Sequence, residues 1–362
     1  MVLATRLQRL GFEVSVATFY PGGALESALA GTGVRLISTQ KAGRWDVLGF
    51  ARRLHRIVDE LKPAVIQSFL GPPNIFSALL QPFHRGSRIV WGVRASDMDL
   101  SLYDYSWRLT AFLERRLSRI PDRIMVNSKA GLDYGAAVGL PVEKIVVISN
   151  GFDTEVFAPN PDARVQLRAE WGVSGDQRLI GMAARLDPIK DHEGFLRTAA
   201  LLKDDSTLRF VCVGGGQGEY VEALKQLART LGLSNSIIWA GERQDMPAVY
   251  NAFDIHVLSS LSEGLSNAVG EAMASGIPCV TTDVGDCPSL VGDTGFVVPI
   301  RDPNAMAEAL RLLLGEGQQG LAQRGASARQ RVMDRYSPES MARDAAALYR
   351  SLIMESPCPT SS

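Results

Sequence analysis

Short apolar runs of strand length alternate with helical patterns along almost the whole chain. Such alternation favours mostly parallel sheets covered by helices on both faces. The runs that we predict as strands are 12–18, 34–39, 64–69, 88–94, 123–128, 145–150, 179–186, 210–215, 237–241, 255–260, 277–282 and 296–299. They are too many for one comfortable doubly wound sheet, so we expect an α/β protein with two sheets in two Rossmann-like domains. The carboxyl ends of their strands, where open parallel sheets bind ligands, would face a common cleft.

The domain boundary is predicted near residues 150–162, where a turn and prolines interrupt the alternation. We therefore expect one domain over 1–152 and a second over 153–337. A last helix is expected over 338–353, with Ser337 as its N-cap. The tail 354–362 is expected to be disordered.

Composition excludes several other classes of protein. Apolar residues make up 46% and charged residues 21% of the 362 residues, as in soluble globular proteins. No apolar stretch approaches the roughly 18 residues of a membrane-spanning helix, and the first residues lack the apolar core of a signal peptide. The four cysteines show no CxxC spacing, and Cys212 and Cys279 lie in apolar runs where buried thiols are expected. We expect a cytoplasmic protein.

Charge is distributed unevenly between the two halves. Residues 1–150 carry 19 Lys and Arg against 12 Asp and Glu, so residues 151–362 carry 19 against 27. A basic first half could bind the anionic inner face of a membrane. The alternative is that these charges are scattered over the surface and only solvated. The predicted helix at 108–123 adds arginines to an apolar face made by Leu109, Phe112, Leu113, Leu117 and Ile120. We expect this face to pack on the domain's own sheet, and a helix lying on an anionic membrane is the alternative.

The segment 262–285 concentrates the residues that can carry chemistry. Glu263 lies in a glycine-bearing loop, and Glu271 follows eight positions later inside a predicted helix. The loop amides and the positive end of that helix would surround one point. The amides concerned are those of Gly264, Leu265 and Ser266. A diphosphate and a sugar would both find partners there.

The loop after the strand at 179–186 adds two cations, Arg185 and Lys190. Departure of a nucleoside diphosphate develops negative charge on its phosphates, and fixed cations at that point stabilise the transition state. Arg offers a planar fork of donors and Lys a compact point charge. Two surface cations beside a helix start are the alternative, which we favour only if the loop is considered without the glutamates.

Together these motifs resemble the nucleotide-sugar site of retaining glycosyltransferases with the GT-B fold, in particular glycosyltransferase family 4 (group 1). The resemblance covers nearly the whole chain, is dense from about 123 to 300, and includes the family's hinge signature NGFD at 150–153. It implies that 153–337 binds the nucleotide-sugar donor and that 1–152 is the acceptor-side domain. It also implies that the helix at 338–353 returns to the first domain.

The resemblance implies a role for each site residue. Glu271 would accept hydrogen bonds from the ribose hydroxyls of the donor, with a favourable charge near a helix start as the alternative. Glu263 would lie beside the transferred sugar, and whether it could act as a nucleophile is left open. Arg185 and Lys190 would grip the donor diphosphate. In this family the leaving phosphate deprotonates the acceptor on the same face, so the configuration is retained.

Two further segments are assigned to the donor by resemblance. The turn at 211–220 lacks the GxGxxG pattern because its third position is Glu219, yet the family places Gly214 and Gly215 near the donor. Arg243 would lie near the nucleobase, and a polar loop capping the next helix is an equal alternative.

The strand at 88–94 departs from the family pattern, because it ends in Arg94 where many members carry a histidine. Arg94 would hold an anionic acceptor or a donor phosphate, or it would pair with a carboxylate such as Asp97. Asp97 and Asp99 form a DxD, which holds a divalent metal in a different glycosyltransferase fold. No histidine or third carboxylate lies close in sequence, so we expect capping aspartates and no metal.

We therefore predict a retaining transferase that moves a hexose-type sugar from a nucleotide-diphosphate sugar to a saccharide or lipid-linked acceptor, in cell-surface polysaccharide or glycolipid synthesis. The nucleotide sugar is a substrate, so no cofactor, no metal and no nucleic-acid partner are expected. The alternatives are a nucleotide-sugar epimerase of the same architecture and a non-catalytic nucleotide-sugar-binding protein or decayed transferase.

The chain starts with a helical pattern, whereas family members start with a strand and a glycine-rich loop that lead into this helix. That first strand is central in a doubly wound sheet. Without it, two strand edges would stay unpaired, at a cost of several kcal/mol. We predict that Met1 is an internal methionine of a longer reading frame. An in-frame stop codon immediately upstream, with a soluble and active short form, would contradict this.

Overall fold

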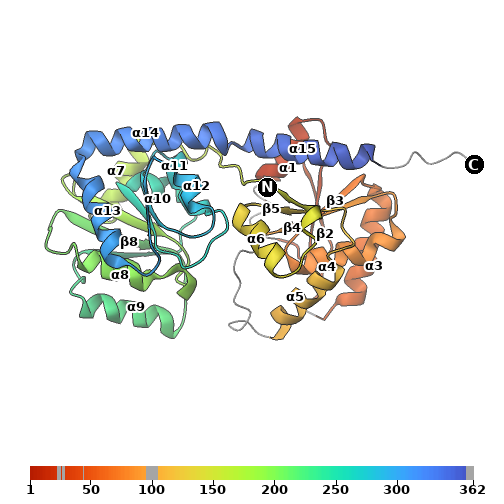
Figure 1. Ribbon diagram of the computed structural model, residues 1–362, viewed down its shortest axis with the longest axis horizontal. Coiled ribbons are helices and arrows are strands. Elements are labelled where there is room, and N and C mark those ends of the chain that lie inside the picture. Colours follow the sequence, from red (N-terminus) through yellow and green to blue (C-terminus); the bar gives the residue numbers. More distant parts are fainter. Residues whose placement is uncertain (23–25, 27–28, 44, 95–104, 356–362) are drawn as a thin grey trace, which may run out of the picture. The chain divides into compact units, whose positions relative to one another are not determined.

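The structure is a computed structural model that divides into two compact units (Figure 1). Unit 1 comprises Met1–Gly151 and Pro338–Ser362, and unit 2 comprises Phe152–Ser337. The described residues are 1–22, 26, 29–43, 45–94, 105–355. The DxD pair Asp97 and Asp99, and residues 356–362 of the tail, lie outside them.

Unit 1 holds six of the predicted strands, each within a few residues of its expected position. Its strands are β1 (Ser15–Thr18), β2 (Arg35–Ser38), β3 (Val65–Phe69), β4 (Arg88–Val93), β5 (Arg123–Val126) and β6 (Ile145–Val147). Its helices of eight or more described residues are α1 (Val2–Arg9), α3 (Val47–Leu61), α4 (Gly71–Leu80), α5 (Tyr105–Leu117), α6 (Lys129–Ala137) and α15 (Pro338–Met354).

The strands of unit 1 form two sheets, which corrects the expectation of one. All pairings are parallel: β1 pairs with β2, and β3 to β6 form a second sheet in sequence order. Among the described residues no pairing joins β1 to β3. Within the described residues, β1 is paired with β2 and β3 is paired with β4.

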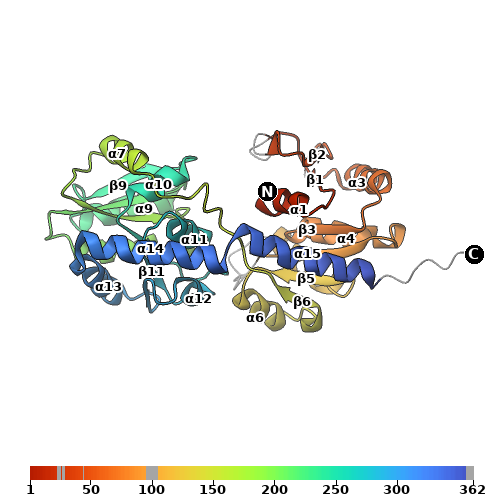
Figure 2. The same ribbon diagram turned by 90° about the horizontal axis from the view of Figure 1, so that it is seen from above.

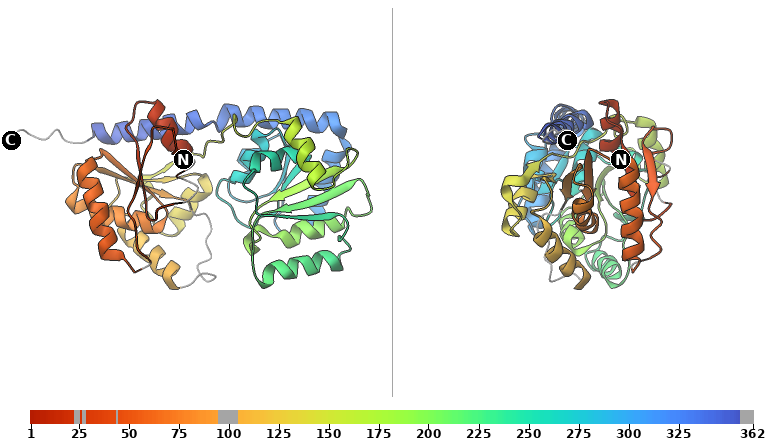
Figure 3. Two further views of the ribbon diagram at one scale, coloured as in Figure 1. Left: turned by 180° about the vertical axis from the view of Figure 1, so that it is seen from behind. Right: turned by 90° about the vertical axis from the view of Figure 1, so that its right-hand side faces the viewer.

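Helices cover both faces of the β3–β6 sheet. On one face lie α1 and α15 (Figure 2). The core beneath them includes Leu7, Val90 and Tyr349. On the other face α4, α5 and α6 enclose a second core around the fully buried Trp91. Two further views show the same ribbon from behind and from one side (Figure 3). Phe19, directly after β1, packs against Phe50 of α3, with 4.4 Å between the ring centroids.

α5 does not bury the apolar face that we expected it to bury. Phe112 is 52% exposed and Leu109 is 42% exposed. The helix turns a different stripe toward α4, and in that stripe Glu114 Oε1 accepts a 2.7 Å hydrogen bond from Asn74 Nδ2. The expectation was wrong, and apolar periodicity cannot show a part-buried polar contact of this kind. No helix within the described residues has the length and apolar character needed to cross a bilayer.

Unit 2 holds the other six predicted strands in one parallel sheet, so the two Rossmann-like α/β domains are confirmed. Its strands are β7 (Arg178–Ala183), β8 (Leu208–Val213), β9 (Ile237–Gly241), β10 (Ile255–Leu258), β11 (Cys279–Thr282) and β12 (Phe296–Val298). The helices are α7 (Pro161–Glu170), α8 (His192–Ala200), α9 (Glu219–Thr230), α10 (Met246–Ala252), α11 (Asn267–Ala274), α12 (Cys287–Val291), α13 (Pro303–Gly315) and α14 (Gly317–Arg335). Helices α8, α9 and α13 cover one face, and α7, α10, α11, α12 and α14 cover the other.

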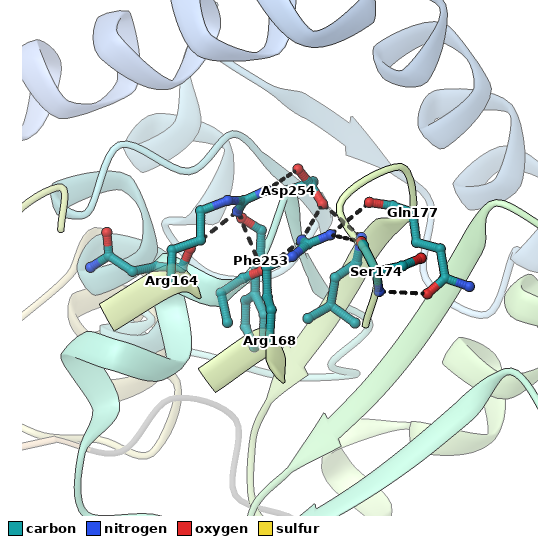
Figure 4. Close-up of polar contacts among 9 residues, drawn as sticks. Arg164, Arg168, Ser174, Gln177, Phe253 and Asp254 are labelled. Carbon is teal, nitrogen blue, oxygen red and sulfur yellow. Dashed lines mark hydrogen bonds and ion pairs between the residues drawn. The ribbon is translucent and has the colours of Figure 1, made fainter. Parts of the chain in front are cut away.

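A charged cluster around Asp254 fixes the amino ends of two central strands (Figure 4). One Asp254 oxygen lies 2.6 Å from Arg164 Nη2, and the other lies 2.9 Å from Arg168 Nη1 and 2.7 Å from the Leu179 amide. Both arginines come from α7 and also donate to carbonyls at the carboxyl end of α10, including that of Phe253. These carbonyls have no partner within their own helix, so the arginines satisfy them.

We predict that Asp254→Ala lowers the free energy of unfolding by about 3–5 kcal/mol, because the buried guanidinium group of Arg168 and the partly exposed one of Arg164 lose their counter-charge. Chemical denaturation followed by circular dichroism would measure the loss. The matched control is Asp293→Ala, whose carboxylate is 93% exposed and lies 3.8 Å from Arg331. The control should change stability by less than about 0.5 kcal/mol. Equal stability of the two variants would contradict a structural role for the cluster.

Candidate functional site

The carboxyl edge of the unit 2 sheet is where the predicted donor residues come together. The strand order is β12-β11-β10-β7-β8-β9, so the winding of the chain reverses between β7 and β10. Loops leave the two strands in opposite directions at such a point and open a crevice for ligands. The loop after β7 carries Arg185 and Lys190, and the loop after β10 carries Glu263.

Lys190 and Glu263 form an ion pair across this crevice. Lys190 Nζ lies 2.5 Å from Glu263 Oε1, and the two side chains are 20% and 12% exposed. Ser260 Oγ donates to the same oxygen at 2.7 Å. The loops are also joined by their backbones, because the Leu261 amide donates to the Ile189 carbonyl at 2.8 Å. A cation and a carboxylate are therefore held at one point by two elements far apart in sequence.

Hydroxyl groups at the strand ends hold these loops in place. Ser259 Oγ donates to the carbonyls of Lys190 at 3.1 Å and Asp191 at 2.8 Å. Thr282 Oγ1, at the end of β11, donates to the Ser260 carbonyl at 2.6 Å. Ser259, Ser260 and Thr282 were not among the predicted site residues. Their signal was the presence of hydroxyl residues directly at the ends of two predicted strands.

Two glycines let neighbouring loops approach the site closely. A Cβ on Gly214 would lie 2.0 Å from the Ala184 carbonyl oxygen, and a Cβ on Gly285 would lie 2.2 Å from that of Glu263. Both have positive φ, of 150° and 53°. The glycine turn after β8 thus packs on the loop of Arg185, and the loop after β11 packs on the glutamate loop. Gly215 follows Gly214 in the same turn, against the Glu242 side chain.

The glutamate loop leads directly into α11. Gly264 accepts a 2.8 Å hydrogen bond from the Asp286 amide, and Leu265 is buried in the core. Ser266 is the N-cap residue of α11, and its side chain makes no capping hydrogen bond. The amino end of α11 therefore lies at the carboxyl edge of the sheet, where a helix dipole favours an anion.

Glu271 lies one turn into α11 and is held by a tyrosine that was not among the predicted site residues. Tyr250 Oη donates to Glu271 Oε2 at 3.0 Å. Burial raises the pKa of Glu271 to about 7, and the hydrogen bond from Tyr250 opposes this rise. Because Tyr250 lies inside a predicted helix, with no motif around it, its sequence position gave no functional signal.

The remaining predicted donor residues differ in their surroundings. Arg185 is 76% exposed, and its Nη2 lies 3.7 Å from Asp187. Arg243 makes a two-pronged contact with Asp245, at 2.8 and 2.7 Å, and a third hydrogen bond of 2.6 Å to Glu170. Arg185 is thus available to a ligand. Arg243 holds the turn that precedes α10, as in the structural alternative.

A buried histidine lies directly behind Lys190. His192 is fully buried at the start of α8. Burial, followed by the charge of Lys190, lowers its pKa to about 4. The ring is therefore neutral near pH 7 and adds no charge to the site.

In unit 1, Arg94 follows β4 and reaches two neighbours. Its Nη1 donates to Asn150 Oδ1 at 2.7 Å, and its guanidinium lies 5.1 Å from the centroid of the Phe69 ring. The alternative partner Asp97 lies outside the described residues. Within the described part of the chain, no group of three or more His, Cys, Asp and Glu side chains has the arrangement of a metal site.

Two protein families match the two halves of this chain. The family described as Glycosyltransferase Family 4 matches residues 1–156, and that described as Glycosyl transferases group 1 matches residues 177–316. Among relatives, EpsF of Bacillus subtilis (strain 168), a protein named as a glycosyltransferase, is 35% identical over 189 residues, which are 49% of this chain and 47% of that protein. The D-inositol 3-phosphate glycosyltransferase of Corynebacterium urealyticum is 30% identical over 251 residues, 66% of this chain and 59% of that one. The chain thus spans roughly half the length of these curated relatives.

Solved structures match the whole fold. A glycosyltransferase from Rickettsia africae has a TM-score of 0.82 at 18% identity, covering 98% of this chain and 94% of that one. Anabaena Alr3699/HepE, solved in complex with UDP, has a TM-score of 0.82 at 21% identity, with 97% and 94% covered. The likeness to the solved structures shows that the chain has the GT-B fold. Because each half matches one of the two families, the chain belongs to the group 1 glycosyltransferases of family 4.

Proposed function

We propose that this protein transfers a hexose-type sugar, with retention of configuration, from a nucleotide-diphosphate sugar to a saccharide or lipid-linked acceptor. The observation that carries the proposal is the Lys190–Glu263 ion pair at the switch point of the unit 2 sheet. A single ion pair of this kind offers a cation for a phosphate and a carboxylate for sugar hydroxyls within a few ångströms. Cell-surface polysaccharide or glycolipid synthesis is the setting that we infer.

The cations of the loop after β7 are assigned to the donor diphosphate. Lys190 is preorganised by Glu263, whereas the exposed Arg185 can move to the phosphates when a donor binds. Negative charge on the diphosphate grows as the bond to the sugar breaks, so a fixed ammonium and a planar guanidinium stabilise the transition state more than the bound donor. The amino end of α11 contributes partial positive charge at the same edge.

Glu263 and Glu271 are assigned to the two hydroxyl-bearing parts of the donor. Glu263 contacts the transferred sugar, and Glu271 accepts from the ribose. In this scheme the acceptor oxygen attacks the anomeric carbon on the face that the diphosphate leaves, and a phosphate oxygen takes the acceptor proton. The protein then supplies charge and orientation, and no metal or cofactor takes part.

Names of related proteins support the choice of donor and acceptor classes. Alr3699/HepE was solved with UDP and with UDP-glucose, so a uridine nucleotide is the first donor to test. Several relatives are named for D-inositol 3-phosphate, which is an anionic acceptor. Arg94, at the carboxyl end of β4, is the residue that we assign to an anionic group of the acceptor or donor.

We predict that Glu263→Ala and Lys190→Ala each lower kcat for sugar transfer or donor hydrolysis by about 100-fold or more, because each removes a group that faces developing charge. Release of the nucleoside diphosphate from a panel of nucleotide sugars would measure this. Nuclear magnetic resonance of the product would give its anomeric configuration, and inversion would contradict retention.

The matched control for this pair is the exposed pair Glu222 and Lys225 on α9, with 3.0 Å between Nζ and Oε1. Glu222→Ala and Lys225→Ala make the same chemical changes in the same unit and should leave kcat unchanged. If the Glu263 and Lys190 variants turn over as fast as these controls, the catalytic assignment fails. If a nucleotide sugar stabilises the protein against unfolding but neither the unchanged protein nor any variant turns it over, a binding protein is favoured instead.

We also propose that unit 1 lies on the cytoplasmic face of an anionic membrane through α5. Phe112 is exposed beside Arg116, whose guanidinium lies 5.2 Å from the centroid of the Phe112 ring. Leu109 and Leu113 are exposed on the same helix, and Arg119 lies two residues beyond its end. An amphipathic helix with aromatic, aliphatic and arginine side chains in contact with solvent is suited to the interface of an anionic bilayer.

We predict that the double substitution Arg116→Ser and Arg119→Ser lowers binding to vesicles of phosphatidylcholine and phosphatidylglycerol by about 30-fold, because each cation near the surface contributes about 1 kcal/mol. Co-sedimentation would measure binding. Arg52→Ser with Arg56→Ser, two exposed arginines of α3, is the charge-matched control and should bind as the unchanged protein does. Equal loss in both double variants would point to net charge rather than α5.

A further inference from the structure

We propose that Tyr250 is a positioning residue for the donor. Its hydroxyl holds one carboxylate oxygen of Glu271 in place, so that the other oxygen stays available to the hydroxyls of the donor ribose. The inference rests on the proposed function, because it takes the ribose as the partner of Glu271. It goes beyond that function by assigning a role to a core residue that lies outside the glutamate motif.

The surroundings of Tyr250 hold its hydroxyl in position to donate one hydrogen bond to Glu271. Its side chain is 1% exposed, and its hydroxyl lies 3.0 Å from Glu271 Oε2. Three rings surround it edge-on, with centroids 5.9, 6.1 and 5.8 Å away. These rings are Phe157, Phe253 and His256. The phenol therefore cannot swing away from Glu271, whereas the Glu271 side chain is partly exposed and can meet a ligand.

The charge of Glu271 depends on few partners. Among the described residues, Tyr250 is the side chain that donates to its carboxylate, and no cation forms an ion pair with it. The other titratable groups beside the phenol are His256 and Cys279. Burial lowers the pKa of His256 to about 4, so its ring is neutral, and burial raises the pKa of the Cys279 thiol, so that it is neutral too. The phenol thus stabilises the ionised form of Glu271 without help from a charge.

This arrangement links donor binding to pH. Burial raises the pKa of Glu271 to about 7, while the Tyr250 hydrogen bond lowers it. Ribose hydroxyls donate best to an ionised carboxylate, so donor affinity should fall as pH drops through about 7. Without the phenol the pKa of Glu271 rises further, and the loss of affinity then begins at a higher pH.

The test compares Tyr250→Phe with Tyr336→Phe. Tyr336 lies in the same unit, and its hydroxyl donates to the Ser289 carbonyl at 3.2 Å rather than to a site glutamate. Calorimetric titration with UDP, and with GDP, between pH 6 and pH 9 gives the dissociation constant of each form. Tyr250→Phe should weaken binding about tenfold near pH 8 and move the pH midpoint upward, as expected when a charged group loses a hydrogen bond. Tyr336→Phe should match the unchanged protein at every pH.

Two further variants separate the inference from the proposed function. Glu271→Gln should bind weakly and show only the pH dependence of the nucleotide's own phosphate, which titrates near pH 6. Glu271→Asp shortens the side chain and so withdraws the carboxylate from the phenol. It should move the pH midpoint of nucleotide binding as Tyr250→Phe does. This variant keeps the test open if Tyr250→Phe does not fold.

The outcomes that overturn each idea are different. If Glu271→Gln binds more weakly but neither Tyr250→Phe nor Glu271→Asp moves the midpoint, the positioning role of Tyr250 is wrong and the ribose role of Glu271 stands. If Glu271→Gln binds as tightly as the unchanged protein, the ribose role itself is wrong. Failure of both nucleotides to bind any folded form would overturn the proposed donor and the inference with it.

Discussion

The position of Asp254 constrains most of unit 2. Asp254 directly precedes β10. Its carboxylate accepts a hydrogen bond from the Leu179 amide at the start of β7, and its backbone amide donates to the Leu179 carbonyl at 2.8 Å. The register that places Ile255 opposite Ile180 is thereby fixed at the amino ends of the two strands. Because both strands are short, this register also decides where their other ends lie. The loops of Lys190 and Glu263 meet at those ends, so a structural ion pair on one edge of the sheet sets the geometry of the candidate site on the other.

Much of this arrangement could be predicted from the sequence, for identifiable reasons. Each predicted strand is present in the structure. The strands could be predicted because buried parallel strands appear in a sequence as short apolar runs between helices. Lys190 and Glu263 lie together because both follow strands of the same sheet, and the strand order makes β7 and β10 neighbours. The same local logic correctly placed buried thiols at Cys212 and Cys279. Periodicity and the position of polar residues after strands carry this much information.

The sequence could not show which distant group satisfies a given polar side chain. Ser260 holds Glu263, and Tyr250 holds Glu271. Ser260 lies at a strand end and Tyr250 lies inside a helix, and neither belongs to a motif. Glu114 of α5 meets Asn74, forty positions earlier in the chain, and Phe112 stays in contact with solvent. Such contacts depend on the assembled fold, where the choice of partner follows from geometry rather than from neighbours in sequence.

The two glutamates of the site show how environment separates identical side chains. Glu263 lies against an ammonium group and a hydroxyl, so its negative charge is balanced where it stands. Within the described part of the chain, Glu271 accepts a side-chain hydrogen bond from Tyr250 and forms no ion pair, and burial raises its pKa to about 7. A buried carboxylate without a cation gains most from new hydrogen-bond donors, because each one offsets part of the lost hydration. The hydroxyls of the sugar donor would therefore be bound most strongly by a carboxylate that has few hydrogen-bond partners within the protein. By this argument the weaker internal support of Glu271 is what suits it to recognise a neutral, hydroxyl-rich part of the donor, while the balanced pair at Lys190 suits the charged part.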